Sequence, residues 1–257
     1  MVHLDLFSGI TGFALAASWV WGEEHEIHCF VEIDPFCQKV IKKHWPGVPI
    51  HGDIKTYEHN GTKIDLLTGG FPCQPFSVAG KQRGKADDRA LWPEMLRIIK
   101  EAKPRWIIGE NVTGIVNMEL DNYVSDLEAE GYETRTFLLP ACAVDAPHRR
   151  DRVWIVAYTE CINDDRSGYG SSSVCGKQSG QAKIQRCGEW LPEPSICELD
   201  DGLPPGLVRY RGRVATGVKD RVNKLKALGS SIVPQCVQPI MECIREIEDN
   251  KCRKEVE

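Results

Sequence analysis

Short apolar runs alternate with helical patterns from residue 1 to residue 157, and this alternation limits the chain to very few architectures. The runs that predict strands are 2–7, 26–31, 64–68, 106–109, 132–139 and 153–157. The segments that predict helices between them are 10–21, 35–44, 91–102 and 117–130. This order favours an α/β fold, a doubly wound parallel sheet. Ligands of such sheets bind at the carboxyl ends of the strands, so we expect functional residues after Phe7, Val31, Thr68 and Gly109.

The composition and the apolar pattern of the chain change after Ala157. Up to Gln185 it is rich in serine, glycine and aspartate, with hardly any periodic apolar pattern. Two helical patterns follow, at 219–228 and 233–247. The expected division is a main domain formed by 1–157 with 217–257, and a small loop-rich region at 158–216.

The bulk composition favours an ordinary globular protein, since 42% of the residues are hydrophobic and 27% are charged. No apolar run approaches the roughly 18–20 residues that span a bilayer. The segment Met1–Gly9 resembles a buried strand and lacks the parts of a signal peptide. We therefore expect a cytoplasmic protein with no membrane partner.

The net charge and the spacing of the cysteines exclude further classes of protein and of site. The formal net charge of −5 excludes a uniformly basic nucleic-acid binder. A local basic stretch remains, because 205–226 holds seven lysines and arginines against one acid. The eleven cysteines include no Cys-x-x-Cys pair, so we expect reduced thiols and no metal site.

A glycine-containing turn joins the first strand to the first helix, at Asp5–Phe13. Glycines let the backbone approach a ligand closely, which suits a nucleotide-like cofactor, although such a turn can also be purely structural. Glu32 follows the second strand, roughly 20 residues after the glycine turn, where an acid can bind ribose hydroxyls. Asp53 could accept a hydrogen bond from an adenine amino group, or cap a turn.

Three further sites carry candidate chemistry at strand ends. Cys73 stands in the rigid segment Gly69–Ser77, where an exposed cysteine could act as a nucleophile. Glu110 follows the strand at 106–109, and a buried, protonated glutamate there could donate to a ring nitrogen, or else cap a helix. Arg150 and Arg152 alternate on what we expect to be an extended segment, so they could share a face that binds a base carbonyl or phosphates, or form surface ion pairs.

Taken together and in this order, the motifs resemble the DNA cytosine-C5 methyltransferase family of bacteria and phages. The motifs that carry the resemblance are Phe71-Pro72-Cys73-Gln74-Pro75-Phe76-Ser77, Glu110-Asn111-Val112, Arg150-Asp151-Arg152 and Leu228-Gly229-Ser230-Ser231-Ile232-Val233-Pro234. The resemblance covers about 1–157 and 217–257. It implies a Rossmann-like, S-adenosylmethionine-dependent methyltransferase domain, with a small target-recognition region at 158–216.

The resemblance also implies a cofactor site for S-adenosylmethionine, with S-adenosylhomocysteine as the product and no metal. Glu32 would bind the ribose hydroxyls, and Asp53 with the Ile54 backbone would bind the adenine. The full set of cofactor-binding residues that it implies is Phe7, Gly9, Gly12, Glu32, Ile33, Asp53, Ile54, Pro72, Ser230 and Ser231.

For catalysis the resemblance implies that Cys73 adds to C6 of a cytosine flipped out of the DNA helix. Glu110 would engage N3 and the exocyclic amine of the base. Arg152 would contact the base oxygen, and Arg150 would support Cys73 and a nearby phosphate.

The partner that the resemblance implies is double-stranded DNA, with a cognate restriction endonuclease as a further partner that it allows. We expect a monomer, because asymmetric base flipping needs no dimer. A loop from Gly80 to Arg89 would close over the flipped base. The residues expected to contact DNA are Gln74, Ser77, Gln82, Arg83, Arg89, Arg209, Arg211 and Arg213. The alternatives are a transfer-RNA cytosine-C5 methyltransferase, a non-catalytic DNA-binding relative and, less favoured, a dinucleotide-dependent oxidoreductase.

Two positions depart from the family pattern. Ser230 stands where the family usually has an asparagine that helps hold the amino-acid end of the cofactor. We hypothesise that serine either lowers cofactor affinity or leaves room for a bulkier sulfonium substituent. His148 stands where a glutamine is frequent, and we expect little effect because Arg150 and Arg152 are intact.

Overall fold

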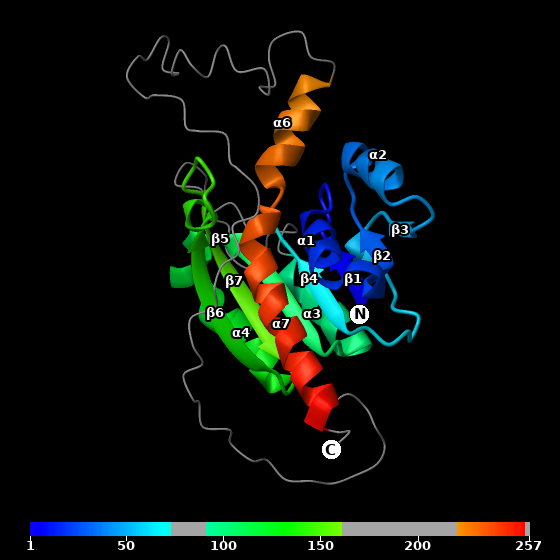
Figure 1. Cartoon of the computed structure of the whole chain (residues 1–257). Coiled ribbons are helices and arrows are strands. Elements are labelled where there is room, and N and C mark those ends of the chain that lie inside the picture. Colours follow the sequence, from blue (N-terminus) through cyan, green and yellow to red (C-terminus); the bar gives the residue numbers. More distant parts are fainter. Residues whose placement is uncertain (73–90, 161–219, 255–257) are drawn as a thin grey trace.

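The structure is a computed structural model that describes residues 1–72, 91–160 and 220–254 (Figure 1). One seven-stranded sheet organises these residues, in the order β3-β2-β1-β4-β5-β7-β6. The strands are β1 Val2–Leu6, β2 Glu26–Val31, β3 Ile50–His51, β4 Leu66–Gly69, β5 Trp106–Val112, β6 Glu133–Pro140 and β7 Asp151–Tyr158. The helices are α1 Gly12–Trp21, α2 Pro35–His44, α3 Trp92–Ala102, α4 Leu120–Ala129, α6 Arg221–Ser230 and α7 Pro234–Lys254. The predicted α/β class is confirmed.

The doubly wound sheet that the sequence predicts contains one antiparallel strand, β7. Strands β1 to β5 pair in parallel, but β7 runs antiparallel to both β5 and β6. The connection from Pro140 to Asp151 contains only a short 3₁₀ helix, Ala141–Val144. A connection this short favours antiparallel pairing, because a parallel crossover takes a dozen or more residues and usually an α-helix.

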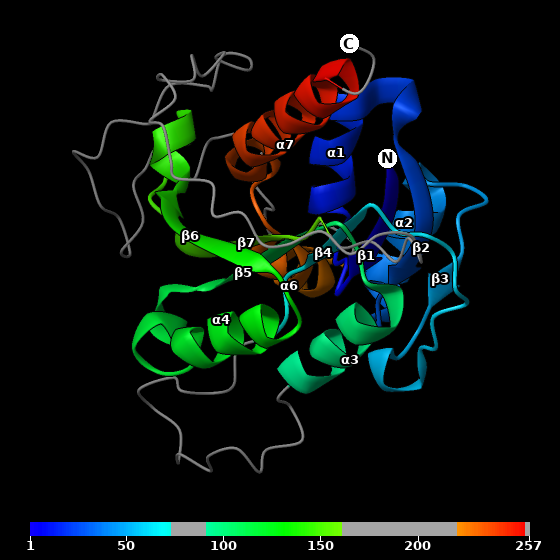
Figure 2. The ribbon, with the colours of Figure 1, turned by 90° about the horizontal axis from the view of Figure 1, so that it is seen from below.

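Helices cover both faces of the sheet (Figure 2). On one face α3 and α4 pack on Leu4, Leu67 and Ile107, and on the other face α1 and α7 pack on Leu66 and Ile108. The strands β1 and β4 are therefore buried on both sides, as parallel strands usually are. This burial places their carboxyl ends, and the loops that follow them, on a rigid base.

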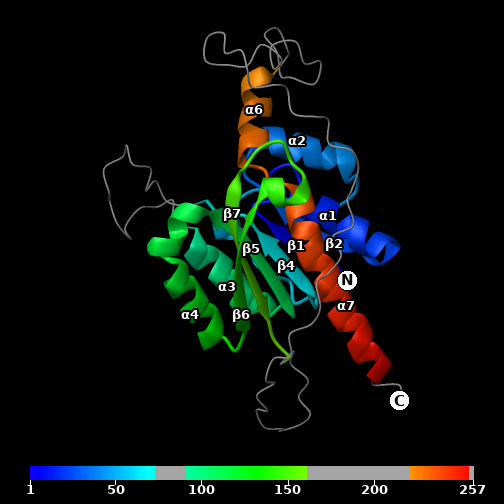
Figure 3. The same cartoon turned by 60° about the vertical axis from the view of Figure 1, so that its left-hand side comes forward.

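Helix α6 comes from far along the sequence but lies beside α2 (Figures 1 and 3). Its neighbour α7 packs along α1. Between the two, Ile232 reaches Gly12, where an added Cβ would lie 2.5 Å from Ile232 Cγ1. The glycine at position 12 is thus required by close packing, and the C-terminal helices cover the turn after β1.

The predicted loop-rich region 158–216 lies outside the described residues beyond Glu160. None of the helices that the structure describes is both long and apolar enough to cross a membrane.

Candidate functional site

The carboxylate of Glu32 connects the loop after β1 to the start of α2. Its Oε2 accepts a hydrogen bond from the backbone N–H of Gly9 at 2.7 Å, and its Oε1 accepts one from the N–H of Asp34 at 2.7 Å. Gly9 has a φ of 53°, a conformation that glycine adopts without strain. A buried acid therefore holds the glycine turn in a fixed shape at the carboxyl end of the sheet.

A cavity of about 250 Å³ opens beside this carboxylate. Its walls come from the loops after β1, β2, β3 and β4, together with one face of α6. The lining residues are Phe7, Gly9, Val31, Glu32, Ile33, Asp34, Cys37, Gly52, Asp53, Ile54, Gly70, Pro72, Leu91, Lys226, Ala227 and Ser230. Eight of the ten predicted cofactor residues line this cavity. The fold therefore brings together predicted residues that lie far apart in the sequence.

Two predicted cofactor residues lie outside the lining. Gly12 contacts Ile232, as described above. The Ser231 hydroxyl donates to the carbonyl of Ile232 at 3.1 Å. Both positions shape the joint between α6, α7 and the glycine turn.

Ser230 lines the cavity, but its hydroxyl is turned back toward its own helix. It donates to the carbonyl oxygens of Lys226, at 3.0 Å, and Ala227, at 3.2 Å. Serine often makes such bonds to the preceding turn of a helix. The hydroxyl therefore does not present the polar group that an asparagine amide at this position would.

An ion pair that the sequence does not predict lies at the rim of the cavity. Lys226 Nζ lies 2.8 Å from Asp34 Oδ2, and this contact lowers the pKa of Asp34 below its ordinary value. The sequence predicts a helix at 35–44, directly after Asp34, and places Lys226 only in the basic stretch 205–226. Nothing in the sequence pairs residues that stand 192 positions apart.

A second group of predicted residues lies close to the segment that leaves β4. Glu110, on β5, is 8% exposed, and its Oε1 lies 2.8 Å from Arg152 Nε on β7. Burial raises the pKa of Glu110 above its ordinary value, and the charges of Arg152 and Arg150 oppose this rise. A carboxyl group in this setting can keep a proton and donate it to a ligand atom.

Arg150 does not follow the extended geometry expected for it. Its φ is 36°, and it precedes the first residue of β7. Its Nη2 donates to the carbonyl oxygens of Gly229, at 2.9 Å, and Ser231, at 2.6 Å. The side chain thus ties the end of α6 to the region around Glu110, whose charge also acts on it.

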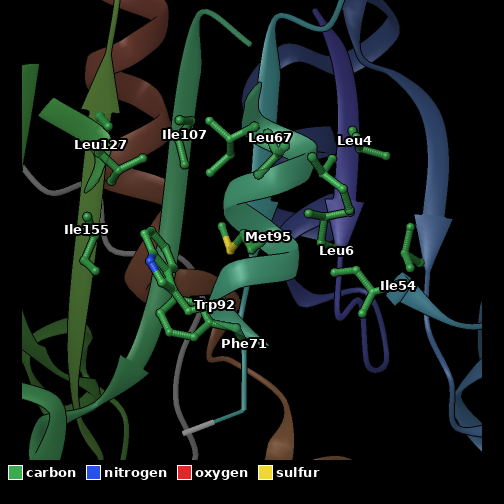
Figure 4. Close-up of a cluster of buried hydrophobic side chains, with 14 of the residues drawn as sticks. Leu4, Leu6, Ile54, Leu67, Phe71, Trp92, Met95, Ile107, Leu127 and Ile155 are labelled. Carbon is green, nitrogen blue, oxygen red and sulfur yellow. The ribbon is translucent and has the colours of Figure 1, made fainter. Parts of the chain in front are cut away.

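The segment Gly70–Pro72 lies close both to the cavity and to Glu110. Gly70 and Pro72 line the cavity, and a Cβ at Gly70 would lie 3.5 Å from Glu110 Oε2. The amide of Asn111 donates to the carbonyl of Phe71 at 3.1 Å. The Phe71 ring packs on Trp92 with their centroids 5.2 Å apart (Figure 4). This segment is therefore anchored on both sides, immediately before Cys73.

Other predicted residues lie outside the described part of the chain. They are Cys73, Gln74, Ser77, Gln82, Arg83, Arg89, Arg209, Arg211 and Arg213. Among the described residues, no cluster of three or more histidine, cysteine or acidic side chains could hold a metal ion.

Comparisons with known proteins point in one direction. Residues 1–187 match the model of the family described as C-5 cytosine-specific DNA methylase. The chain is 35% identical over 237 residues to the Type II methyltransferase M.HgiCII of Herpetosiphon aurantiacus, covering 88% of this chain and 50% of that protein. It is 36% identical over 160 residues to the Type II methyltransferase M.NgoMIV of Neisseria gonorrhoeae, covering 60% of this chain and 50% of that protein. The chain thus spans about half the length of these relatives.

Solved structures agree on the fold. A crystal structure of a Spodoptera frugiperda DNMT2 mutant superposes with a TM-score of 0.52 at 25% identity, covering 63% of this chain and 51% of that one. A prophage-encoded protein from E. coli, described as a putative DNA modification methyltransferase, gives a TM-score of 0.51 at 24% identity, covering 64% and 49%. The predicted Rossmann-like methyltransferase fold is confirmed.

Proposed function

This chain belongs to the C-5 cytosine-specific DNA methylase family, and we propose that it transfers a methyl group from S-adenosylmethionine to C5 of a cytosine in a specific double-stranded DNA sequence. The observation that carries the proposal is the position of Gly70–Pro72. Gly70 and Pro72 line the cavity, and Gly70 also lies close to the buried Glu110, which pairs with Arg152. We propose that Cys73, which follows this segment directly in the sequence, acts between a cofactor and a base.

The cavity has the chemistry that S-adenosylmethionine requires. Each oxygen of the Glu32 carboxylate accepts one backbone hydrogen bond and keeps a lone pair for a ribose hydroxyl. Asp53 and the Ile54 backbone lie at the same wall, where they would bind the adenine, and Phe7 and Ile33 add apolar surface. The bound cofactor would supply an electrophilic methyl group at its sulfonium, and S-adenosylhomocysteine would leave as the product.

The residues of the chain would perform the remaining chemistry. The Cys73 thiolate forms a bond to C6 of the cytosine, and the electron pair of the C5–C6 double bond moves toward N3, where a proton held by Glu110 is donated. Arg152 binds the base oxygen and keeps Glu110 oriented. The cofactor would supply the methyl group that bonds to C5, while the bond from that methyl group to the sulfonium sulfur breaks. A base then removes the C5 proton, the electron pair re-forms the C5–C6 double bond and expels Cys73, and N3 returns its proton to Glu110.

The face of a stacked base is inaccessible, so the cytosine must leave the helix, at a cost of a few kcal/mol. We propose that Gln74, Ser77, Gln82, Arg83 and Arg89 offset this cost near the base. Arg209, Arg211 and Arg213, in the proposed target-recognition region 158–216, would read the sequence. The chain would act as a monomer, and a restriction endonuclease of the same specificity is a partner that fits the family.

The proposal predicts transfer of labelled methyl groups to DNA. The purified chain is incubated with methyl-labelled S-adenosylmethionine and either unmethylated genomic DNA or bulk transfer RNA, and the methylated positions are mapped. We expect 5-methylcytosine in DNA at a short recurring sequence, with no label for Cys73→Ser. Cys142→Ser, which changes an exposed cysteine elsewhere, is the matched control and should keep activity. Label in RNA alone, or none with either polymer, would overturn the proposal.

The cofactor site predicts a gain on restoring the family residue. Ser230→Asn should lower the Kd for S-adenosylhomocysteine by about two- to ten-fold, since one added hydrogen bond contributes about 0.5–1.5 kcal/mol. Calorimetric titration measures it. Ser230→Ala should change the Kd little, because the Ser230 hydroxyl bonds to its own helix. An unchanged Kd and unchanged selectivity for the sulfonium substituent in Ser230→Asn would remove the hypothesis about this position.

A further inference from the structure

Helix α6 forms the one wall of the cavity that comes from the C-terminal part of the described chain. Lys226, Ala227 and Ser230 face the cavity, while the other lining residues belong to the first 91 positions. Ala227 is buried there, and most of the helix is exposed. The position of α6 therefore decides how far the cavity is open.

Among the described residues, α6 makes polar contacts at its C-terminal end and at the rim of the cavity. At its end, Arg150 Nη2 binds the carbonyl oxygens of Gly229 and Ser231. At the rim of the cavity, Lys226 Nζ binds Asp34 Oδ2 at 2.8 Å. These contacts connect α6 to the Glu110 side of the site at one point and to α2 at the other.

The two partners of the rim contact differ in how firmly they are held. Asp34 is the N-cap of α2, and its Oδ1 accepts the N–H groups of Phe36, at 2.8 Å, and Cys37, at 3.4 Å. The Lys226 side chain is 72% exposed. An ion pair as exposed as this contributes little to stability and is weakened by salt. It can open readily without unfolding either helix.

We propose that Lys226 and Asp34 form a latch that holds α6 over the bound cofactor and slows its release. Both residues are positioning residues, because they act through α6. The inference rests on the proposed function, since the ligand of the cavity is taken to be S-adenosylmethionine or its product. Release of the product would then require the latch to open, with Arg150 keeping the end of α6 in place.

The latch predicts a change in the rate of ligand release. Tritium-labelled S-adenosylhomocysteine is bound to the full chain and chased with unlabelled ligand. Lys226→Gln and Asp34→Asn should each raise the dissociation rate by about two- to five-fold, the range for an exposed ion pair. Asparagine is also a good N-cap, so Asp34→Asn removes the charge and keeps the start of α2. Lys226→Arg should keep the wild-type rate.

Two readouts separate a latch from general damage. The double variant should release ligand no faster than either single variant, because the pair is already broken. Raising the salt concentration from about 20 mM to about 0.5 M should speed release from the wild type and leave Lys226→Gln nearly unchanged. Lys224→Gln changes a lysine of the same helix outside the cavity and is the matched control.

The latch is wrong if the wild type and both single variants release ligand at equal rates. It is also wrong if the effects add in the double variant, or if Lys224→Gln has the same effect. Each of these results would leave the proposed function standing. If the wild type binds neither S-adenosylmethionine nor S-adenosylhomocysteine, the proposed function fails, and the latch with it.

Discussion

Glu110→Gln is expected to lower kcat by about 10²- to 10³-fold while leaving cofactor affinity nearly unchanged. A general acid or base contributes typically 10²- to 10⁴-fold. Glutamine keeps the shape of the side chain and can still donate a hydrogen bond, but it cannot deliver a proton to N3 of the base. Steady-state transfer of labelled methyl groups to DNA measures kcat, and titration with S-adenosylhomocysteine measures the affinity.

The control for this substitution is Glu133→Gln, an exposed glutamate on β6, which should keep the wild-type rate. Because Glu110→Gln also removes the partner of Arg152, thermal unfolding of both variants must be compared with the wild type. If Glu110→Gln is folded and keeps more than about a tenth of the wild-type kcat, the role of Glu110 as a proton donor is wrong.

The elements around the site could be predicted because strong local signals mark them. The bounds of β2 and α2 agree with the sequence, since an apolar run precedes an aspartate N-cap and a proline at the first helical position. The direction of β7 was not predictable from its apolar pattern, which is the same for either orientation. β3, Ile50–His51, was missed because two residues are too few to show a period.

The walls of the cavity were predictable to the extent that strand ends converge on one edge. Phe7, Glu32 and Pro72 follow three strands that the sequence predicts, and this topology brings them together. Asp53 follows β3, which the sequence does not predict. Contacts made by long polar side chains were not predictable. Arg150 was expected beside Arg152 on an extended segment, but its positive φ turns it to the end of α6.

Asp5→Asn is expected to stabilise the protein at alkaline pH. Asp5 is fully buried on β1, directly before the glycine turn, and its Oδ1 accepts the hydroxyl of Thr68 at 2.6 Å. Its Oδ2 has no hydrogen-bond partner among the described residues. Burial raises the pKa of Asp5 to about 7, the nearby Glu32 charge adds to the rise, and the hydroxyls of Thr68 and Ser8 oppose it.

Proton binding by Asp5 decides the direction in which stability changes with pH. The folded chain holds the Asp5 proton more tightly than the unfolded chain, whose pKa at this group is near 3.8. Stability from this group is therefore complete below about pH 4 and is lost as the pH rises to about 7. Asparagine keeps an oxygen for Thr68 and cannot ionise. The gain in the free energy of unfolding from Asp5→Asn should thus grow by roughly 2–3 kcal/mol between pH 5 and pH 8.

Two histidines next to Asp5 must be separated from this effect. His3 Nε2 lies 2.7 Å from Thr68 Oγ1, and His3 Nδ1 lies 3.0 Å from His25 Nε2. Burial lowers the pKa of both rings, so they destabilise the fold as the pH falls through about 6.5, the opposite direction. The free energy of unfolding of the variant and of the wild type is measured by urea unfolding at each pH. The contribution of the two histidines cancels in the difference, because both proteins contain them. Asp121→Asn, at an exposed aspartate, should show no such growth. If the Asp5→Asn variant is less stable than the wild type at pH 8, the fold needs the buried carboxylate in its ionised form next to the glycine turn.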